Sequence, residues 1–294
     1  MNLEAGTLVT LDVAREVSPY GYFMTDGERD VLLHYTETTT KVAPGDRLEV
    51  FLYYDTEDRL AATMHRPMLL LGELALLEVV DLHPRFGAFL EMGIGRNLLL
   101  PFKEMPELEE LRPQVGDRIY VTMDHDRQGR LVARLAGEEV LMNECFPAPQ
   151  TWRNQWKNAR VYKPLQMGTF VVVDGGVVGF GAIGLIPASE RDRLLRVGEE
   201  VSVRVTYIRE DGRINLSMRQ PKEKGRDLDA ERILEVLRER PNGAMPYSDQ
   251  TGADVIMTKF GISKSAFKRA LGKLMKDGLV YQKENWTCLK QEEN

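Results

Sequence analysis

The chain contains one pattern three times, as PGDRLEVFLYYDTEDRLAATM (residues 44–64), VGDRIYVTMDHDRQGRLVARL (115–135) and VGEEVSVRVTYIREDGRINLSM (197–218). Each version has a glycine at its second position, followed by an acidic residue. Apolar and polar residues then alternate up to a short polar loop, and they alternate again after it. Alternation with a period of two is typical of a strand with one buried face, and Asp211-Gly212 is a tight-turn dipeptide. The repeats therefore predict three similar antiparallel hairpins.

A second pattern precedes each hairpin, as YGYFMTDGERDVLLHYTE (20–37), FGAFLEMGIGRNLLLPFKE (86–104) and MGTFVVVDGGVVGFGAIGLIPASE (167–190). Each version has a large side chain, a glycine, any residue and a phenylalanine, followed by a glycine-containing turn and an apolar strand. Together the two patterns supply roughly five strands in ~70 residues, which is the size of a small closed barrel. We therefore predict barrels at residues 1–66, 72–140 and 150–221.

The last part of the chain changes to a helical period. After a charged linker at 219–229, Ile233, Val236 and Leu237 form an apolar stripe that Pro241-Asn242-Gly243 ends. The following sequence predicts a second helix at 253–259, a third helix from the N-cap Ser263 to Asp277-Gly278, and strands at 279–282 and 286–289. This order in residues 228–290 resembles a winged helix.

The repeated part resembles the S1-type RNA-binding domain, which has the OB fold. The second copy carries Phe86-Gly87-Ala88-Phe89 and an Asp126 to Arg130 loop, and the third carries Gly184-Leu185-Ile186 and Gly212-Arg213. Three S1-like barrels followed by a winged helix resemble the bacterial conserved virulence factor B family, whose members are RNA-binding regulators of gene expression. The resemblance implies a mainly β chain with a C-terminal α+β domain, and a post-transcriptional role.

The S1 resemblance also implies which residues contact RNA. An S1 sheet stacks unpaired bases on exposed aromatic rings and places cations beside them. The corresponding positions are Tyr20, Phe23, His34, Asp55 and Arg59 in the first copy, Phe86, Phe89, Pro101, Asp126 and Arg130 in the second, and Met167, Phe170, Pro187, Arg209 and Arg213 in the third. We expect the glycine between the two aromatic positions to bulge the strand, so that both side chains face outward. In the alternative, Phe23, Phe89 and Phe170 fill the barrel cores.

Charge indicates where most of the affinity lies. Residues 1–66 hold 6 Lys/Arg and 12 Asp/Glu, whereas residues 150–222 hold 12 and 7. The third copy adds Arg204, Arg209 and Arg213, together with a basic lead-in at residues 152–157. We expect the two tryptophans of this lead-in, Trp152 and Trp156, at a domain interface. Because phosphate attraction supplies much of the non-specific affinity for nucleic acid, we expect the third barrel to bind RNA more strongly than the first.

The third predicted helix of the C-terminal domain carries a basic face. Phe267, Leu271 and Leu274 share one side of it, and the opposite side carries the predicted nucleic-acid contacts Arg269, Lys273 and Lys276. We expect single-stranded RNA to bind mainly through the third barrel and the winged helix. Structured RNA or duplex DNA is the alternative ligand of the winged helix.

Other functional classes find little support. The four histidines lack metal-ligand spacing, and no phosphate-binding loop or nucleophile elbow is present, so no enzyme activity, cofactor or metal is expected. Two distant cysteines, the absence of a signal-peptide pattern, and a glycine-broken apolar stretch at 171–188 favour a cytoplasmic protein without a membrane partner. Two rivals stay open: a DNA-binding transcriptional regulator acting through the winged helix, and a protein-interaction adaptor with degenerate barrels.

Overall fold

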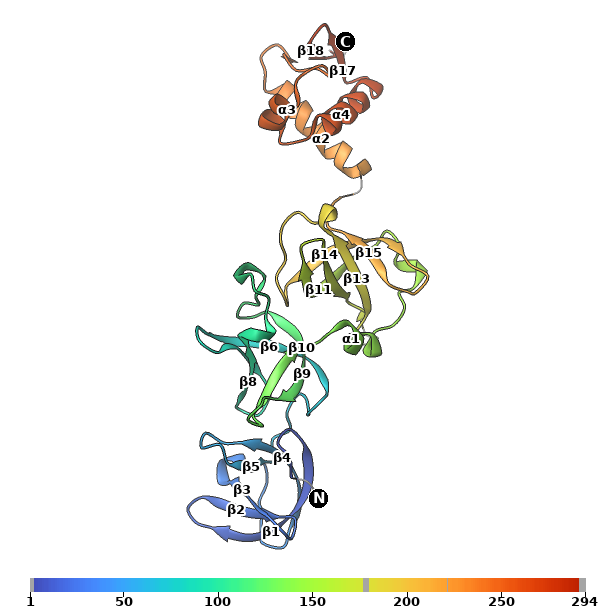
Figure 1. The fold of residues 1–294 in the computed structure, drawn as a ribbon. Helices are drawn as coiled ribbons and strands as arrows, with labels where there is room; N and C mark the ends of the chain where they lie inside the picture. Colours follow the sequence, from blue (N-terminus) through green and yellow to red (C-terminus); the bar gives the residue numbers. More distant parts are fainter. Residues whose placement is uncertain (1–2, 177–179, 221, 291–294) are drawn as a thin grey trace. The chain divides into compact units, whose positions relative to one another are not determined.

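A computed structural model describes residues 3–176, 180–220 and 222–290, of which 222–226 are described by backbone alone. It forms two compact units, Met1–Arg219 and Gln220–Asn294. The first unit contains three closed five-stranded barrels, and the second contains a helical domain with a small sheet (Figure 1). The predicted fold class, three OB-type barrels followed by a winged helix, is confirmed.

The three barrels share one strand order, in which the third and fifth strands of each pair in parallel and all other neighbours are antiparallel. The first barrel consists of β1 (Leu8–Val17), β2 (Gly21–Thr25), β3 (Asp30–His34), β4 (Arg47–Tyr54) and β5 (Leu60–Thr63). The second consists of β6 (Leu74–His83), β7 (Gly87–Glu91), β8 (Asn97–Pro101), β9 (Arg118–His125) and β10 (Leu131–Leu135). The third consists of β11 (Trp156–Leu165), β12 (Gly168–Val173), β13 (Ala182–Pro187), β14 (Glu200–Ile208) and β15 (Ile214–Ser217).

The predicted hairpins are β4–β5, β9–β10 and β14–β15, and their alternating residues fill the barrel cores. Gly212 lies at φ +80° in the predicted tight turn. Residues 177–179, inside the predicted turn between β12 and β13, lie outside the described residues. Closing each sheet on itself removes the unpaired strand edges that would otherwise invite aggregation.

The alternation of β4 breaks at Val50–Tyr53, where four consecutive residues are buried. The outward residues Phe51 and Tyr53 belong to one apolar cluster with Leu77 and Met92 of the second barrel. The His125 side chain also reaches the first barrel, with Nε2 at 2.9 Å from the Ala5 carbonyl oxygen. The second barrel therefore covers the outer surface of the β4–β5 hairpin of the first barrel.

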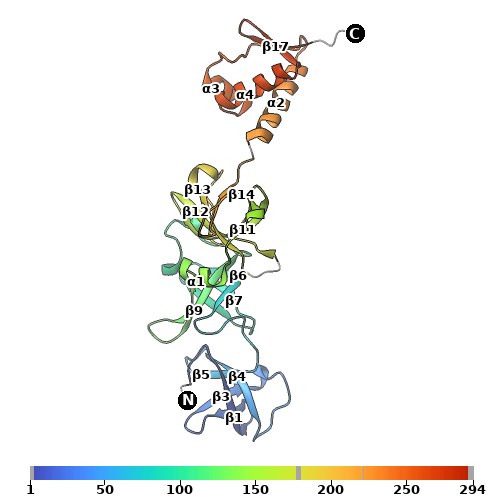
Figure 2. The same ribbon diagram turned by 90° about the vertical axis from the view of Figure 1, so that its right-hand side faces the viewer.

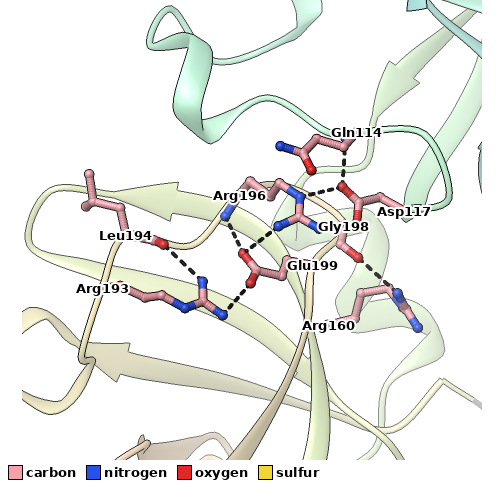
Figure 3. Close-up of polar contacts among 8 residues, drawn as sticks. All are labelled: Gln114, Asp117, Arg160, Arg193, Leu194, Arg196, Gly198 and Glu199. Carbon is pink, nitrogen blue, oxygen red and sulfur yellow. Dashed lines mark hydrogen bonds and ion pairs between the residues drawn. The ribbon is translucent and has the colours of Figure 1, made fainter. Parts of the chain in front are cut away.

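The second and third barrels are joined by a charged network (Figure 3). The Arg196 guanidinium donates from Nε and Nη2 to Asp117 Oδ2 and Oδ1, at 2.7 and 2.8 Å. Its Nη1 lies 3.4 Å from Glu199, which Arg193 also contacts, at 2.5 Å. The side chains of Asp117 and Glu199 are each only 9% exposed. Both carboxylates therefore depend on arginines that replace water as hydrogen-bond donors.

A short helix between the second and third barrels also packs at this junction. It is α1 (Glu138–Glu144), and its Leu141 is fully buried in a cluster with Tyr120, Tyr162 and Val172. A single buried leucine in one short helix leaves no periodic signal. No helix was predicted at this place.

The C-terminal unit has the winged-helix order (Figure 2). Its elements are α2 (Lys222–Arg238), β16 (Ala244–Met245), α3 (Ala253–Phe260), α4 (Lys264–Lys276), β17 (Val280–Lys283) and β18 (Trp286–Leu289), with the sheet in the order β16-β18-β17. Ser263 caps α4 as predicted, its Oγ accepting from the Ala266 N–H at 3.2 Å. The helix α2 takes in most of the predicted linker, and β16 was not predicted. No helix among the described residues is long and apolar enough to cross a membrane.

Candidate nucleic-acid interface

The second and third strands of every barrel place the same residue types in the same register. Phe23 pairs with Leu32, Phe89 with Leu99, and Phe170 with Leu185. All six side chains are partly exposed, whereas their strand neighbours Met24, Leu90 and Val171 are fully buried. We call the outward residues of these two strands, together with the large residue before the glycine, the platform of each barrel.

The large residue before the glycine is the most exposed part of each platform. Tyr20, Phe86 and Met167 are 57%, 55% and 78% exposed. Gly21 and Gly87 have φ angles of +149° and +137°, and an added Cβ would lie 2.1 and 2.0 Å from the carbonyl oxygens of Leu33 and Leu100. No side chain fits at these two positions.

The expected bulge lies elsewhere. The register shifts on the first strand of each barrel, between Val13 and Arg15, Val79 and Asp81, and Val161 and Lys163. Tyr20 and Phe86 precede β2 and β7, and the glycine begins each strand. The bulge prediction was therefore placed on the wrong strand, because the sequence spacing does not show which of two paired strands carries the extra residue.

The first platform combines rings with cations that already hold carboxylates. The Arg15 guanidinium lies 4.5 Å from the centre of the Phe23 ring and 2.7 Å from Asp30. Arg59 donates from Nε and Nη2 to Asp55 Oδ2, at 3.0 and 2.8 Å. The His34 Nδ1 lies 2.8 Å from the Thr36 hydroxyl. Phe23, His34 and Arg59, which were predicted to contact RNA, therefore lie on the outer surface, but the charges of Arg15 and Arg59 are partly neutralised.

The second platform has the same arrangement around its loop. Arg130 donates to Asp126 Oδ2 from Nε at 2.9 Å and from Nη2 at 2.8 Å. Burial raises the pKa of Asp126, but the N–H groups of Arg130 and Gln128 and the Arg130 guanidinium outweigh it, so the pKa is lowered. The aspartate is therefore ionised at neutral pH. Phe86 stacks on His83 with ring centres 4.4 Å apart.

The third platform is covered at one end by α1. Val172 pairs with Ile183 at the register position that holds Thr25 with Asp30 and Glu91 with Asn97 in the other barrels. The apolar pair packs with Leu141 of α1. Arg213 lies 2.8 Å from Glu138 and donates to the Met142 sulfur at 3.3 Å. The other end of this platform, at Met167, is open to solvent.

The other two predicted arginines of the third barrel, Arg204 and Arg209, differ in their hydrogen bonds. Arg209 donates from Nε to Asn215 Oδ1 at 3.1 Å. The Arg204 Nε is buried and has no hydrogen-bond partner among the described residues. Opposite Arg204 in the sheet register lies Trp156, which is 37% exposed. Trp152 is 8% exposed and lies in the core cluster of the third barrel itself. Trp152 therefore packs within a single barrel, so the prediction of a domain interface was wrong for this residue.

Two of the three predicted cations of the winged helix are exposed to solvent, and the third lies in an ion pair. Arg269 and Lys276 of α4 are exposed, but Lys273 lies 2.7 Å from Asp227 of α2. Sequence reasoning missed two exposed aromatic residues on the hairpin that follows, Tyr281 and Trp286, although their alternation with buried Val280 was visible. Among the described residues, no group of His, Cys, Asp and Glu side chains is arranged to hold a metal ion.

Comparison with known proteins supports the same architecture. Four family models match: an S1 domain at residues 5–65, the CvfB first S1-like domain at 74–134, the second domain of virulence regulatory factor CvfB at 143–220, and a CvfB-like winged helix domain at 231–289. A crystal structure of a Streptococcus pneumoniae multidomain protein with nucleic acid binding domains is similar, with a TM-score of 0.62 and 29% identity over 97% of this chain and 98% of that one.

Two curated relatives extend over most of the chain. The uncharacterized protein YitL of Bacillus subtilis is 39% identical over 290 residues, which are 99% of this chain and 95% of the relative. Conserved virulence factor B of Staphylococcus epidermidis is 31% identical over 237 residues, covering 80% of this chain and 77% of the relative. With all four of its domains matched in order, the chain belongs to the conserved virulence factor B family.

Proposed function

We propose that this protein is a non-catalytic, cytoplasmic regulator of gene expression that binds single-stranded RNA, mainly through its third barrel and its winged helix. The observation that carries the proposal is the platform, which recurs in the same register on all three barrels. Exposed rings on a sheet suit unpaired bases, whose faces are free for stacking. The related Streptococcus pneumoniae structure, described as having nucleic acid binding domains, supports a nucleic-acid ligand.

The assignment to the third barrel rests on the residue beside the platform phenylalanine. In the first barrel this position is Arg15, which is paired with Asp30, and in the second it is Asp81. In the third it is Lys163, which is exposed and makes no ion pair with any described residue. A cation without a carboxylate partner is the one that attracts a phosphate most strongly.

Binding to single-stranded RNA and to duplex DNA of the same sequence, over a salt series, tests the proposal. We expect RNA to bind more tightly and its affinity to fall steeply with salt, as for any ligand held through phosphates. Tighter binding of duplex DNA would instead support a transcriptional regulator acting through Arg269 and Lys276. Binding of neither nucleic acid at moderate salt would support the protein adaptor.

Lys163→Glu is expected to weaken binding of single-stranded RNA about tenfold and to reduce the slope of log affinity against log salt by about 1 to 2. The new carboxylate repels the phosphate that Lys163 would otherwise attract. Lys41→Glu, at an exposed lysine that belongs to no platform, makes the same charge change and should leave affinity within about twofold. Tyr20→Ala should have less effect than Lys163→Glu, and the reverse order contradicts the assignment to the third barrel.

Glu138→Ala is expected to tighten RNA binding by about threefold, because it releases Arg213 from an ion pair at the third platform. The control is Glu139→Ala on the same helix, where the glutamate is exposed and holds no arginine. Both variants remove one negative charge, so the difference between their affinities isolates Arg213. Equal affinities would show that Arg213 takes no part in binding.

A further inference from the structure

The β17–β18 hairpin has one face in the core of the winged helix and one face in solvent. Val280 and Thr287 are buried, and the Thr287 hydroxyl donates to the Tyr247 carbonyl oxygen at 2.7 Å. Tyr281 pairs with Cys288 and Lys283 with Trp286 on the opposite face. The backbone N–H of Lys290 donates to the Leu279 carbonyl oxygen at 3.0 Å, which extends the hairpin by one pair. The wing face therefore comprises Leu279, Tyr281, Lys283, Trp286, Cys288 and Lys290.

This face leaves large apolar side chains in water. Leu279, Tyr281 and Trp286 are 42%, 45% and 46% exposed. Burial of the alternate residues Val280 and Thr287 fixes the register, so these side chains cannot turn inward without unfolding the hairpin. A tryptophan and a tyrosine that are both exposed on one small surface indicate a binding site, because they pack against nothing in the protein's own core.

The charge of the wing face specifies its ligand. Two of its six residues are lysines and none is acidic. The platforms of the first two barrels differ, because carboxylates neutralise their arginines. The two ammonium groups make no ion pair with any described residue. Flat rings beside such cations match a polyanion with exposed planar bases. Duplex bases offer no free face to such rings, which favours unpaired nucleotides over a double helix.

We propose that the wing face binds unpaired RNA nucleotides, with Trp286 and Tyr281 stacking on bases and Lys283 and Lys290 contacting phosphates. The proposal rests on the RNA-binding function proposed above and adds a site that lies outside α4 and outside the barrels. It also explains why α4 can leave Lys273 in an ion pair with Asp227. In this arrangement the wing, rather than the third helix, makes the base contacts of the domain.

The test uses the full-length protein and a fluorescently labelled single-stranded RNA, with affinity measured by anisotropy. We expect Trp286→Ala to weaken binding about tenfold, and the double variant with Tyr281→Ala to weaken it further, since each stacked base contributes to affinity. Trp286→Phe keeps a ring and should retain most of the affinity. Tyr54→Ala removes a tyrosine that is 37% exposed on β4 of the first barrel and belongs to no platform, and it should bind as the unchanged protein does.

A second measurement guards against a variant that fails to fold. Photo-crosslinking of the unchanged protein to RNA containing 4-thiouridine should attach RNA to residues 279–290. Crosslinks confined to the barrels or to α4 overturn the wing site.

The two proposals fail in different ways. If the unchanged protein does not bind single-stranded RNA, the proposed function falls and the wing site falls with it. If the unchanged protein binds RNA but the double variant binds within twofold of it, only the wing site is overturned. Loss of duplex DNA binding without loss of RNA binding in Trp286→Ala also overturns it.

Discussion

Arg196→Ala is expected to lower the free energy of unfolding of the three-barrel unit by about 3 kcal/mol. Removing the guanidinium takes two hydrogen-bond donors from the nearly buried Asp117, and it takes from Glu199 the weaker of its two arginine partners. A buried carboxylate that loses its partner retains the full penalty of leaving water. Because the network joins the second and third barrels, we expect the junction to loosen before either barrel unfolds.

Thermal denaturation and limited proteolysis check this prediction. The variant should melt earlier and should be cut faster in the segment between β10 and β11. Arg127→Ala, at an exposed arginine of the β9–β10 loop, is the control and should change stability by less than about 0.5 kcal/mol. The double variant with Asp117→Ala should lose less stability than the sum of the single variants, because it removes both members of the pair. Additive losses would mean that the two side chains do not interact in solution.

The sequence predicted the barrels because their information is local. Alternating residues within one hairpin show which face is buried, and the same pattern in three copies excludes chance. The four consecutive buried residues at Val50–Tyr53 follow from a different cause, since the outer face of that hairpin meets another barrel. Alternation distinguishes a core side from an outer side, but it does not show what the outer side touches.

The sequence likewise predicted those parts of the candidate site that depend on residues close together in the chain. The platform rings could be placed because the motif spacing carries them, and the Arg59 and Arg130 pairs lie within four residues of their aspartates. Long-range pairs left no such signal. Arg213 meets Glu138, and Lys273 meets Asp227, only after folding brings together separate elements. Net charge by segment therefore overstated how many arginines and lysines are free to bind phosphates.

Gly87→Ala is expected to lower the free energy of unfolding by about 4 kcal/mol and to disrupt the second barrel. Two causes add. The residue has φ +137°, which alanine adopts only with strain, and its new Cβ would lie 2.0 Å from the Leu100 carbonyl oxygen. To relieve this contact, β7 must separate from β8 where Phe86 and Phe89 form the platform. Chemical denaturation followed by circular dichroism measures the loss.

Two other glycines separate these causes. Gly129 has φ +82° with no atom within 4 Å of an added Cβ, so Gly129→Ala should show only the backbone strain, about 1 to 2 kcal/mol. Gly168 occupies the corresponding place in the third barrel without a left-handed φ, and its added Cβ would lie 2.9 Å from the nearest oxygen, which predicts an intermediate loss. If Gly87→Ala is no worse than Gly129→Ala, the close approach of β7 to β8 is not what requires glycine. The platform geometry would then require glycine for its backbone conformation alone.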